Sequence, residues 1–205
     1  MVTSASSWTI RPVEPADAEQ WAVLYSGYRG FYRLPDDPDA VLTTWRWVVG
    51  REHGLQGLVA VDGSGRLGAL ANLRSFARPS AAAFGLYLDD LYTDPDARRN
   101  GLGGMLLDAA AAQAAAAGAT LVRWITAESN TVARSVYDAH ATATPWVTYD
   151  MAPQRTGSAV ASGSASQERS ASQERSATGW QVGSAPGSRS ESGPAVAPSA
   201  RQGRR

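Results

Sequence analysis

The chain of 205 residues has no cysteine and no lysine, so all 19 of its basic residues are arginine. Without cysteine it has no disulfide, no thiolate metal site and no cysteine nucleophile, and its redox compartment stays undetermined. Without lysine it has neither a P-loop phosphate site nor a Schiff base. With only His53 and His140 a histidine-rich metal site is excluded, which leaves carboxylates alone for a hard cation. We therefore expect no metal.

Long hydrophobic runs are also missing. The opening segment MVTSASSWTIRP does not place a basic region before an apolar one, and no apolar run reaches about 18 residues. These absences argue against a secretion signal and a membrane helix. We expect a cytoplasmic protein without a membrane partner.

Aromatic residues are abundant in the first part of the chain and almost absent from the second. Residues 1–151 contain all seven tyrosines, all three phenylalanines and six of the seven tryptophans, whereas residues 152–205 contain only Trp180. The second part is rich in Ser, Ala, Gly and Arg, and it repeats SASQER in tandem. Such a segment buries too little apolar area to offset its ordering entropy. We predict a folded domain over residues 1–151 and a disordered tail over 152–205, whose function is left open.

The net charge of zero combines two opposite contributions. Residues 1–151 hold 12 arginines against 16 acidic residues, and residues 152–205 hold seven arginines against three glutamates. A mildly acidic domain with scattered arginines in its tail lacks the basic surface of a nucleic-acid-binding protein. We expect no nucleic-acid partner.

The spacing of apolar residues predicts a sheet flanked by helices. Strands are expected at Ser7–Val13, in two runs joined by the turn DGSGR, and at Ala82–Thr93, Thr120–Thr126 and Pro145–Met151. Helices are expected from near Pro15, from Pro38 after a cap at Asp36 or Asp37, at Leu102–Ala117 and at Thr131–His140. The order β α α β β β α β α β indicates an α/β (α+β) domain with a mixed sheet.

The stretch DPDARRNGLGG lies between a predicted strand and a predicted helix. It does not fit a dinucleotide fingerprint, because Leu106 stands where the third glycine would be required. What remains is Arg98-x-x-Gly101-x-Gly103. The N–H groups of a first helical turn attract anions, and glycines let a phosphate approach them closely. The pattern favours binding of a pyrophosphate or a similar anion; the alternative is that the glycines only shape the loop.

Two segments resemble the GNAT superfamily of N-acetyltransferases. LDDLYTDPDARRNGLGGMLL is similar to the acetyl-coenzyme A motif of that family, Arg/Gln-x-x-Gly-x-Gly/Ala after an acidic-apolar strand end. WITAESNTVARSVYDAH is similar to the second motif, an asparagine followed seven residues later by a tyrosine. The motifs occur in the family's order, about 30 residues apart. The resemblance covers Trp8 to Met151 and implies the family's mostly antiparallel central sheet.

The resemblance also implies acetyl-CoA as co-substrate and assigns residues to it. Leu91 and Thr93 would offer backbone groups to the pantetheine arm, and Asn130, which also suits a helix N-cap, would hydrogen-bond it. Tyr137 would protonate the departing thiolate, with a purely core role as the alternative. The pyrophosphate would be held by Arg98, Arg99, Asn100, Gly101, Leu102, Gly103 and Gly104.

Acetylation of an amine requires a base that removes a proton from the ammonium. Asp89 and Asp90 are neighbours on one predicted strand and are therefore expected to face opposite sides of the sheet. Asp89 would then share a side with Leu91 and Thr93, and similar family members carry an acidic residue there. We predict Asp89 as the base; a structural pairing of either carboxylate with an arginine is the alternative.

The resemblance implies an N-acetyltransferase that moves an acetyl group directly, in a ternary complex, to a small amine, an amino acid, a polyamine or a lysine side chain. Tyr28 and Tyr32 are our candidates for acceptor binding, because aromatic faces near carboxylates suit a cationic amine. A non-catalytic acyl-CoA-binding or sensing protein on the same fold is the alternative. The sequence leaves open which amine is used and whether the protein is a homodimer.

Overall fold

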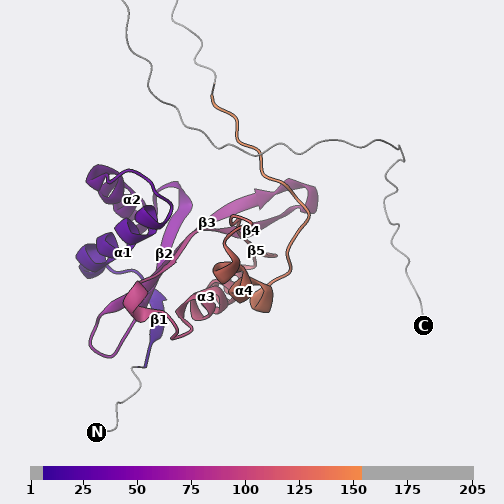
Figure 1. The fold of residues 1–205 in the computed structure, drawn as a ribbon. Helices are drawn as coiled ribbons and strands as arrows, with labels where there is room; N and C mark the ends of the chain where they lie inside the picture. Colours follow the sequence, from indigo (N-terminus) through magenta and orange to yellow (C-terminus); the bar gives the residue numbers. More distant parts are fainter. Residues whose placement is uncertain (1–6, 154–205) are drawn as a thin grey trace, which may run out of the picture. The chain divides into compact units, whose positions relative to one another are not determined.

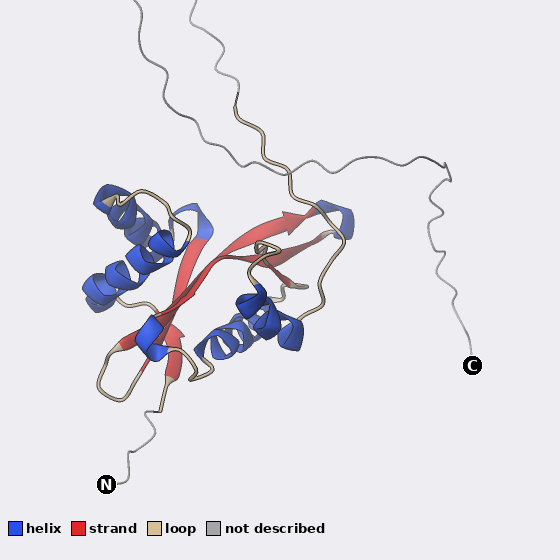
Figure 2. Cartoon of the chain, in the orientation of Figure 1, coloured by secondary structure: helices blue, strands red, loops and turns tan. Residues whose placement is uncertain are grey.

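The computed structural model describes residues 7–153, which are drawn in colour in Figures 1 and 2. Residues 154–205 lie outside the described residues, and with them lie the SASQER repeat and nearly all of the predicted tail. Within residues 7–153, no helix is long and apolar enough to cross a membrane.

In the described part of the chain, five strands form one sheet with the order β1-β2-β3-β4-β5. The first four pair antiparallel and the last pairs parallel with its neighbour. The predicted mixed, mostly antiparallel sheet is thereby confirmed. The strands are β1 (Thr9–Pro12), β2 (Leu55–Val61), β3 (Leu67–Arg78), β4 (Ala83–Thr93) and β5 (Val122–Arg123).

Helices cover both faces of this sheet (Figures 1 and 2). α1 and α2 lie on one face, over a core that includes Trp21, Leu24 and Leu70. α3 lies on the other face, over a core that includes Leu73 and Leu106, and α4 packs beside it. The helices are α1 (Ala18–Phe31), α2 (Pro38–Gly50), α3 (Leu102–Ala117) and α4 (Thr131–His140).

The helix ends follow from local chemistry that the sequence displays. Asp37 caps α2, since its Oδ1 accepts a hydrogen bond from the Ala40 N–H at 2.9 Å. Gly118 ends α3 with a φ of 76°, a conformation that glycine adopts without strain. The predicted positions of α2, α3 and α4 are confirmed.

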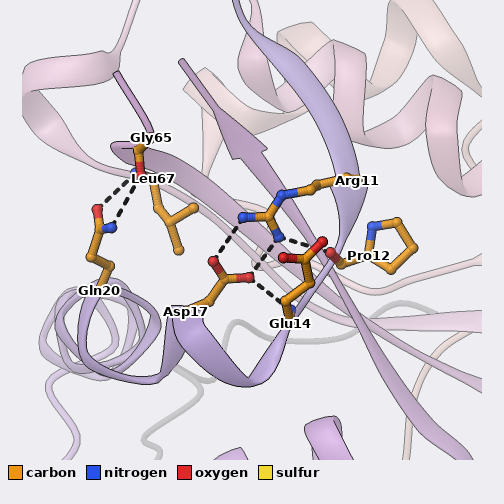
Figure 3. Close-up of polar contacts among 7 residues, drawn as sticks. All are labelled: Arg11, Pro12, Glu14, Asp17, Gln20, Gly65 and Leu67. Carbon is orange, nitrogen blue, oxygen red and sulfur yellow. Dashed lines mark hydrogen bonds and ion pairs between the residues drawn. The ribbon is translucent and has the colours of Figure 1, made fainter. Parts of the chain in front are cut away.

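A buried ion pair fixes the chain where it leaves β1 and enters α1 (Figure 3). Arg11 donates to both carboxylate oxygens of Asp17, at 2.7 and 2.8 Å. Further along, Gln20 bridges to the β2–β3 turn: its Nε2 donates to the Gly65 carbonyl, and its Oε1 accepts from the Leu67 N–H. These contacts hold α1 against the hairpin that contributes the central strand.

The end of the domain departs from the sequence prediction. The strand expected at Thr120–Thr126 is reduced to the two residues of β5, and the strand expected at Pro145–Met151 is absent, because residues 141–153 form neither helix nor strand. Val147, Tyr149 and Met151 alternate with polar residues as in a strand, yet all three are exposed. Alternation predicts which side chains would share a face, but a strand also needs a neighbouring edge with which to pair.

Candidate functional site

The loop between β4 and α3 ends in a helix N-terminus that offers free donors. Gly101 stands at the N-cap with a φ of 73°, and no side chain caps this helix. The first N–H to bond back into the turn is that of Met105, which donates to the Gly101 carbonyl at 3.0 Å. The N–H groups of Leu102, Gly103 and Gly104 therefore remain available, at the positive end of the helix dipole.

The space around these glycines indicates what they are for. A Cβ atom built on Gly103 would meet no atom within 4 Å, so the packing of the described chain does not require glycine there. A glycine inside a helix lowers helix stability by about 1 kcal/mol relative to alanine. Helix stability therefore does not explain the glycine at position 103 either. Gly104 differs, because a Cβ there would lie 2.9 Å from His140 Nε2. The open face at Gly101 and Gly103 fits the approach of a phosphate group.

The polar residues of the loop are held by contacts within the loop itself. The Arg98 Nε donates to the Thr93 carbonyl at 3.4 Å, and the Asn100 Nδ2 donates to the Ala97 carbonyl at 3.0 Å. Arg99 has a φ of 65°, which is unusual for a residue with a side chain. Two arginines and three free N–H groups thus border the same helix end. The structure brings together the whole predicted cradle from Arg98 to Gly104.

The outer edge of β4 is open over its second half. The ladder to β5 covers only Leu86 and Tyr87, so within the described residues no strand pairs with this edge from Leu88 to Thr93. Leu91 and Thr93, the predicted backbone partners of the pantetheine arm, lie on this open stretch. An extended molecule with amide groups can add to such an edge as a further strand does.

Helix α4 presents Tyr137 beside the sheet, and Asn130 caps its first turn. Asn130 Oδ1 accepts from the Ala133 N–H, and its Nδ2 donates to Thr126 Oγ1 at 3.2 Å. Tyr137 contacts the ring of Trp124, with a centroid distance of 5.3 Å. Burial, and then the nearby Tyr32 hydroxyl, raise the pKa of Tyr137 to about 12. Tyr137 is therefore a protonated phenol at neutral pH.

Asp90 lies in a cluster of polar groups on the α1 side of β4. Its Oδ2 accepts a hydrogen bond from Asn72 Nδ2 at 2.9 Å, and it also accepts from the Tyr28 hydroxyl. The rings of Tyr25 and Tyr28 are stacked with centroids 5.6 Å apart, and Tyr28 meets Tyr32 edge-on at 5.0 Å. We call Asp90, Asn72, Tyr25, Tyr28 and Tyr32 the Asp90 cluster.

The expectation that Asp89 and Asp90 face opposite sides of the sheet is wrong. β3 pairs Asn72 with Asp90 but Leu73 with Leu88, so Asp89 is the extra residue of a β-bulge, which interrupts the alternation of side chains. Tyr25 on α1 interacts electrostatically with both carboxylates. Both therefore lie on the α1 side, and Asp89 does not share a side with Leu91, which packs on the α3 side.

Asp89 is engaged by an arginine. Arg74 Nε donates to its Oδ1 at 3.0 Å, and the guanidinium lies over the ring of Tyr87 at 4.7 Å. Burial raises the pKa of Asp89 above its usual range, while Arg74 opposes this rise. The alternative that the sequence offered, pairing of one carboxylate with an arginine, is what the structure shows for Asp89.

Asn72 is a member of the cluster that the sequence analysis missed. It is fully buried, and its Oδ1 has no hydrogen-bond partner in the described part of the chain. The sequence does contain an indication of its role, because Asn72 interrupts the apolar run LGALANL of a predicted strand. An amide buried in such a strand needs polar partners. Without the pairing of β3 with β4, its partner could not be named.

Within residues 7–153, no group of three or more His, Asp or Glu side chains is placed to hold a metal ion. His140, whose role the sequence left open, joins α4 to α3 through a contact of 3.0 Å between its Nδ1 and Asp108 Oδ1.

Comparison with known sequences agrees with this geometry. The family model described as Acetyltransferase (GNAT) family matches residues 19–141, which is more than half of the chain. The D-amino-acid N-acetyltransferase HPA3 of Saccharomyces cerevisiae is 28% identical over 141 residues, covering 68% of this chain and 88% of the yeast protein.

Solved structures share the fold. A probable acetyltransferase superposes with a TM-score of 0.64 at 22% identity, covering 72% of this chain and 99% of the other. The ribosomal-protein-alanine N-acetyltransferase of Brucella melitensis biovar Abortus gives 0.62 at 19%, covering 71% and 99%. The aminoglycoside N-acetyltransferase AAC(6')-Iy, in complex with CoA, gives 0.62 at 17%, covering 74% and 99%. The chain belongs to the GNAT family of acetyltransferases, which use acetyl-CoA.

Proposed function

We propose that this protein transfers an acetyl group from acetyl-CoA to a primary amine, directly and within a ternary complex. The observation that carries the proposal is the open helix end at Gly103, where neither packing nor helix stability accounts for glycine. A second observation supports it: Tyr32 acts electrostatically on Tyr137 and is itself affected by Asp90, as expected for a proton donor and a carboxylate in one site.

The residues that would hold the coenzyme follow from the open donors. The N–H groups of Leu102, Gly103 and Gly104 would bind the pyrophosphate, with Arg98 and Arg99 adding positive charge. Leu91, Thr93 and Asn130 would contact the pantetheine arm along the open edge of β4. The bound thioester supplies an activated acetyl group and a thiolate leaving group.

Side chains of this protein would carry out the two proton transfers that the reaction requires. Tyr137 keeps its proton at neutral pH and would give it to the departing thiolate. One of the two adjacent carboxylates, Asp89 or Asp90, would take the proton of the ammonium. Because the chain has no cysteine, no acyl-thiol intermediate on this residue type is available, and we infer direct transfer.

The acceptor class is proposed from what the similar proteins share. Their names specify D-amino acids, the alanine of a ribosomal protein and aminoglycosides, and each of these carries an amino group. Tyr28 on α1 and Tyr32 at its C-cap are the proposed acceptor contacts, since Tyr28 hydrogen-bonds Asp90 and the exposed Tyr32 packs edge-on against Tyr28.

The proposal is tested by changing Gly103 and measuring coenzyme binding by titration calorimetry. Gly103→Ala should weaken CoA binding about tenfold, and Gly103→Glu should abolish it, because each side chain would occupy the open face and the second adds repulsive charge. Neither variant should unfold the protein, since the space at Gly103 is empty.

Gly63 provides the matched control. It lies in the β2–β3 turn, also with no atom within 4 Å of a built Cβ, so Gly63→Glu makes the same change away from the site. We expect this control to bind CoA as the wild type does. Equal CoA binding by the wild type and Gly103→Glu would show that the glycines only shape the loop, and it would overturn the proposed pyrophosphate site.

A further inference from the structure

Asp90 is a largely buried carboxylate whose contacts are all neutral. Its hydrogen-bond donors are the amide of Asn72 and the hydroxyl of Tyr28. No arginine contributes to its electrostatic surroundings in the described residues, whereas Arg74 neutralises Asp89. Buried carboxylates are normally paired with a cation, because hydrogen bonds from neutral groups only partly replace the lost hydration. Asp90 thus has no cationic partner among the side chains that the structure describes.

The side chains around Asp90 suit a ligand cation. Tyr25 and Tyr28 lie on α1 and Tyr32 follows at its C-cap, and Asp90 acts electrostatically on all three hydroxyls. Tyr25 is buried, while Tyr32 is 42% exposed, so the tyrosines extend from the core to the surface. Aromatic faces attract cations and pack against short carbon chains. The exposed end of the row is also the end near Tyr137.

We infer that Asp90, rather than Asp89, binds the ammonium group of the acceptor and removes its proton. This inference rests on the proposed acetyl transfer and specifies its acceptor site. The acceptor is a small alkylammonium ion whose uncharged carbon chain lies against Tyr28 and Tyr32. A carboxylate beside the amine is disfavoured, because Asp90 already supplies a negative charge there and no arginine of the described residues offsets it.

The proton transfers balance with the groups present. Asp90 takes one proton from the ammonium, and the free amine forms the N–C bond to the acetyl carbon as the C–S bond breaks. Tyr137 gives its proton to the departing thiolate and is reprotonated by the second proton of the acceptor nitrogen. Asp90 then releases its proton to water. Burial raises the pKa of Asp90 above its usual range, which makes it a stronger base than an exposed carboxylate.

The test compares Asp90→Asn with Asp89→Asn in the full chain, with exposed Asp138→Asn as the control for lost charge. Acetylation of propylamine, 1,4-diaminobutane and alanine is followed by thiol release across pH. We expect Asp90→Asn to lower kcat/KM for propylamine by about 10²–10⁴-fold and to remove the acidic limb of the pH profile. Asp138→Asn should change it less than about fivefold, Asp89→Asn should lower it less than Asp90→Asn does, and propylamine should exceed alanine by at least about tenfold.

A binding measurement separates this inference from the proposed function. Propylammonium chloride is titrated into each protein while the tyrosine ring signals are followed by NMR, with 1-propanol as the uncharged control. Binding that Asp90→Asn removes, without turnover, supports the ammonium site and overturns acetyl transfer. Turnover or ammonium binding that survives Asp90→Asn but is lost in Asp89→Asn overturns the assignment to Asp90. A preference for alanine over propylamine overturns the acceptor class.

Discussion

Tyr137 has one neighbour that is consistent with a packing role in the core and another that is consistent with a role as proton donor. The ring of Trp124 packs against it, while the Tyr32 hydroxyl links it to the Asp90 cluster. Tyr137→Phe keeps the packing and removes the proton. We predict that this change lowers kcat about 10²-fold and leaves the Kd for CoA within about twofold, as measured by thiol release and titration calorimetry.

The pH dependence of the wild-type rate provides a second test of Tyr137. Because the pKa of Tyr137 is raised to about 12, the phenol stays protonated through neutral and mildly alkaline pH, and the wild-type rate should show no alkaline limb due to Tyr137 below about pH 10. Tyr149→Phe, at an 88% exposed position, is the control and should leave kcat unchanged. A wild-type rate in Tyr137→Phe would overturn the role of proton donor and leave Tyr137 as a core aromatic.

At the level of single residues, the sequence named candidates but could not supply their geometry. Tyr28, Tyr32 and Tyr137 were each named, and the structure brings them into one region. The choice between Asp89 and Asp90 relied on strict alternation, and the β-bulge interrupts it. A bulge depends on how two strands pair, so it could not be predicted from one of the strands alone. The roles of these residues stay predictions.

The joint between β1 and α1 depends on one buried ion pair. Arg11 lowers the pKa of Asp17 through its hydrogen bonds, and the Glu14 N–H adds a further one at 2.8 Å. Asp17→Asn leaves Arg11 without a charged partner, so we predict a loss of about 2–3 kcal/mol in the free energy of unfolding at neutral pH. Urea denaturation measures this loss, and CoA binding should weaken little because the pair lies away from the cradle.

The sign of the pH dependence provides a second check on this pair. A carboxylate whose pKa is lowered in the folded state stabilises the protein above its unfolded pKa of 3.8, and this stabilisation is lost as the pH falls through the folded value. The difference between wild type and Asp17→Asn should therefore vanish in strong acid. Arg66→Gln breaks the more exposed pair with Asp94 and should cost less than about 1 kcal/mol. An equal cost for both variants would show that burial of the Asp17 pair does not matter.

Elements were predictable where their signals are local. The cap at Asp37, the helix-ending Gly118 and the turn DGSGR each lie within a few residues of the element that they define. The last two strands were predicted less well, because strands form only against an available edge. β5 pairs with only two residues of β4, and the same shortness leaves the edge of β4 open for the proposed coenzyme.

The whole domain places its candidate site where the two helix layers approach the same strand. Tyr25 and Tyr28 of α1 lie near Asp90 on one side of β4. α3 begins shortly after β4 ends, and α4, which packs beside α3 (Figure 1), contributes Tyr137. The bulge and the open edge both belong to this strand. β4 is therefore the element on which coenzyme and acceptor would converge.

The extent of the folded domain leads to a prediction for the whole chain. The compact unit that contains all of these elements is Met1–Tyr149, and Trp146, Val147, Tyr149 and Met151 are all more than 70% exposed at its end. Because exposed side chains contribute little burial, a chain ending at Met151 and one ending at Ala143 should unfold within about 2 °C of the full chain. Both should bind CoA with unchanged affinity.

The comparison of the two truncations decides what residues 144–151 contribute. If only the shorter chain unfolds earlier, and if its sedimentation shows a smaller assembly, these apolar side chains are buried against a second copy and the prediction for the monomer is wrong. If both chains behave as the full protein does, the fold and the coenzyme site reside before Thr144. The alternation of Val147, Tyr149 and Met151 with polar residues would then predict a strand that does not form. In the structure of the single chain these residues form no strand and are exposed.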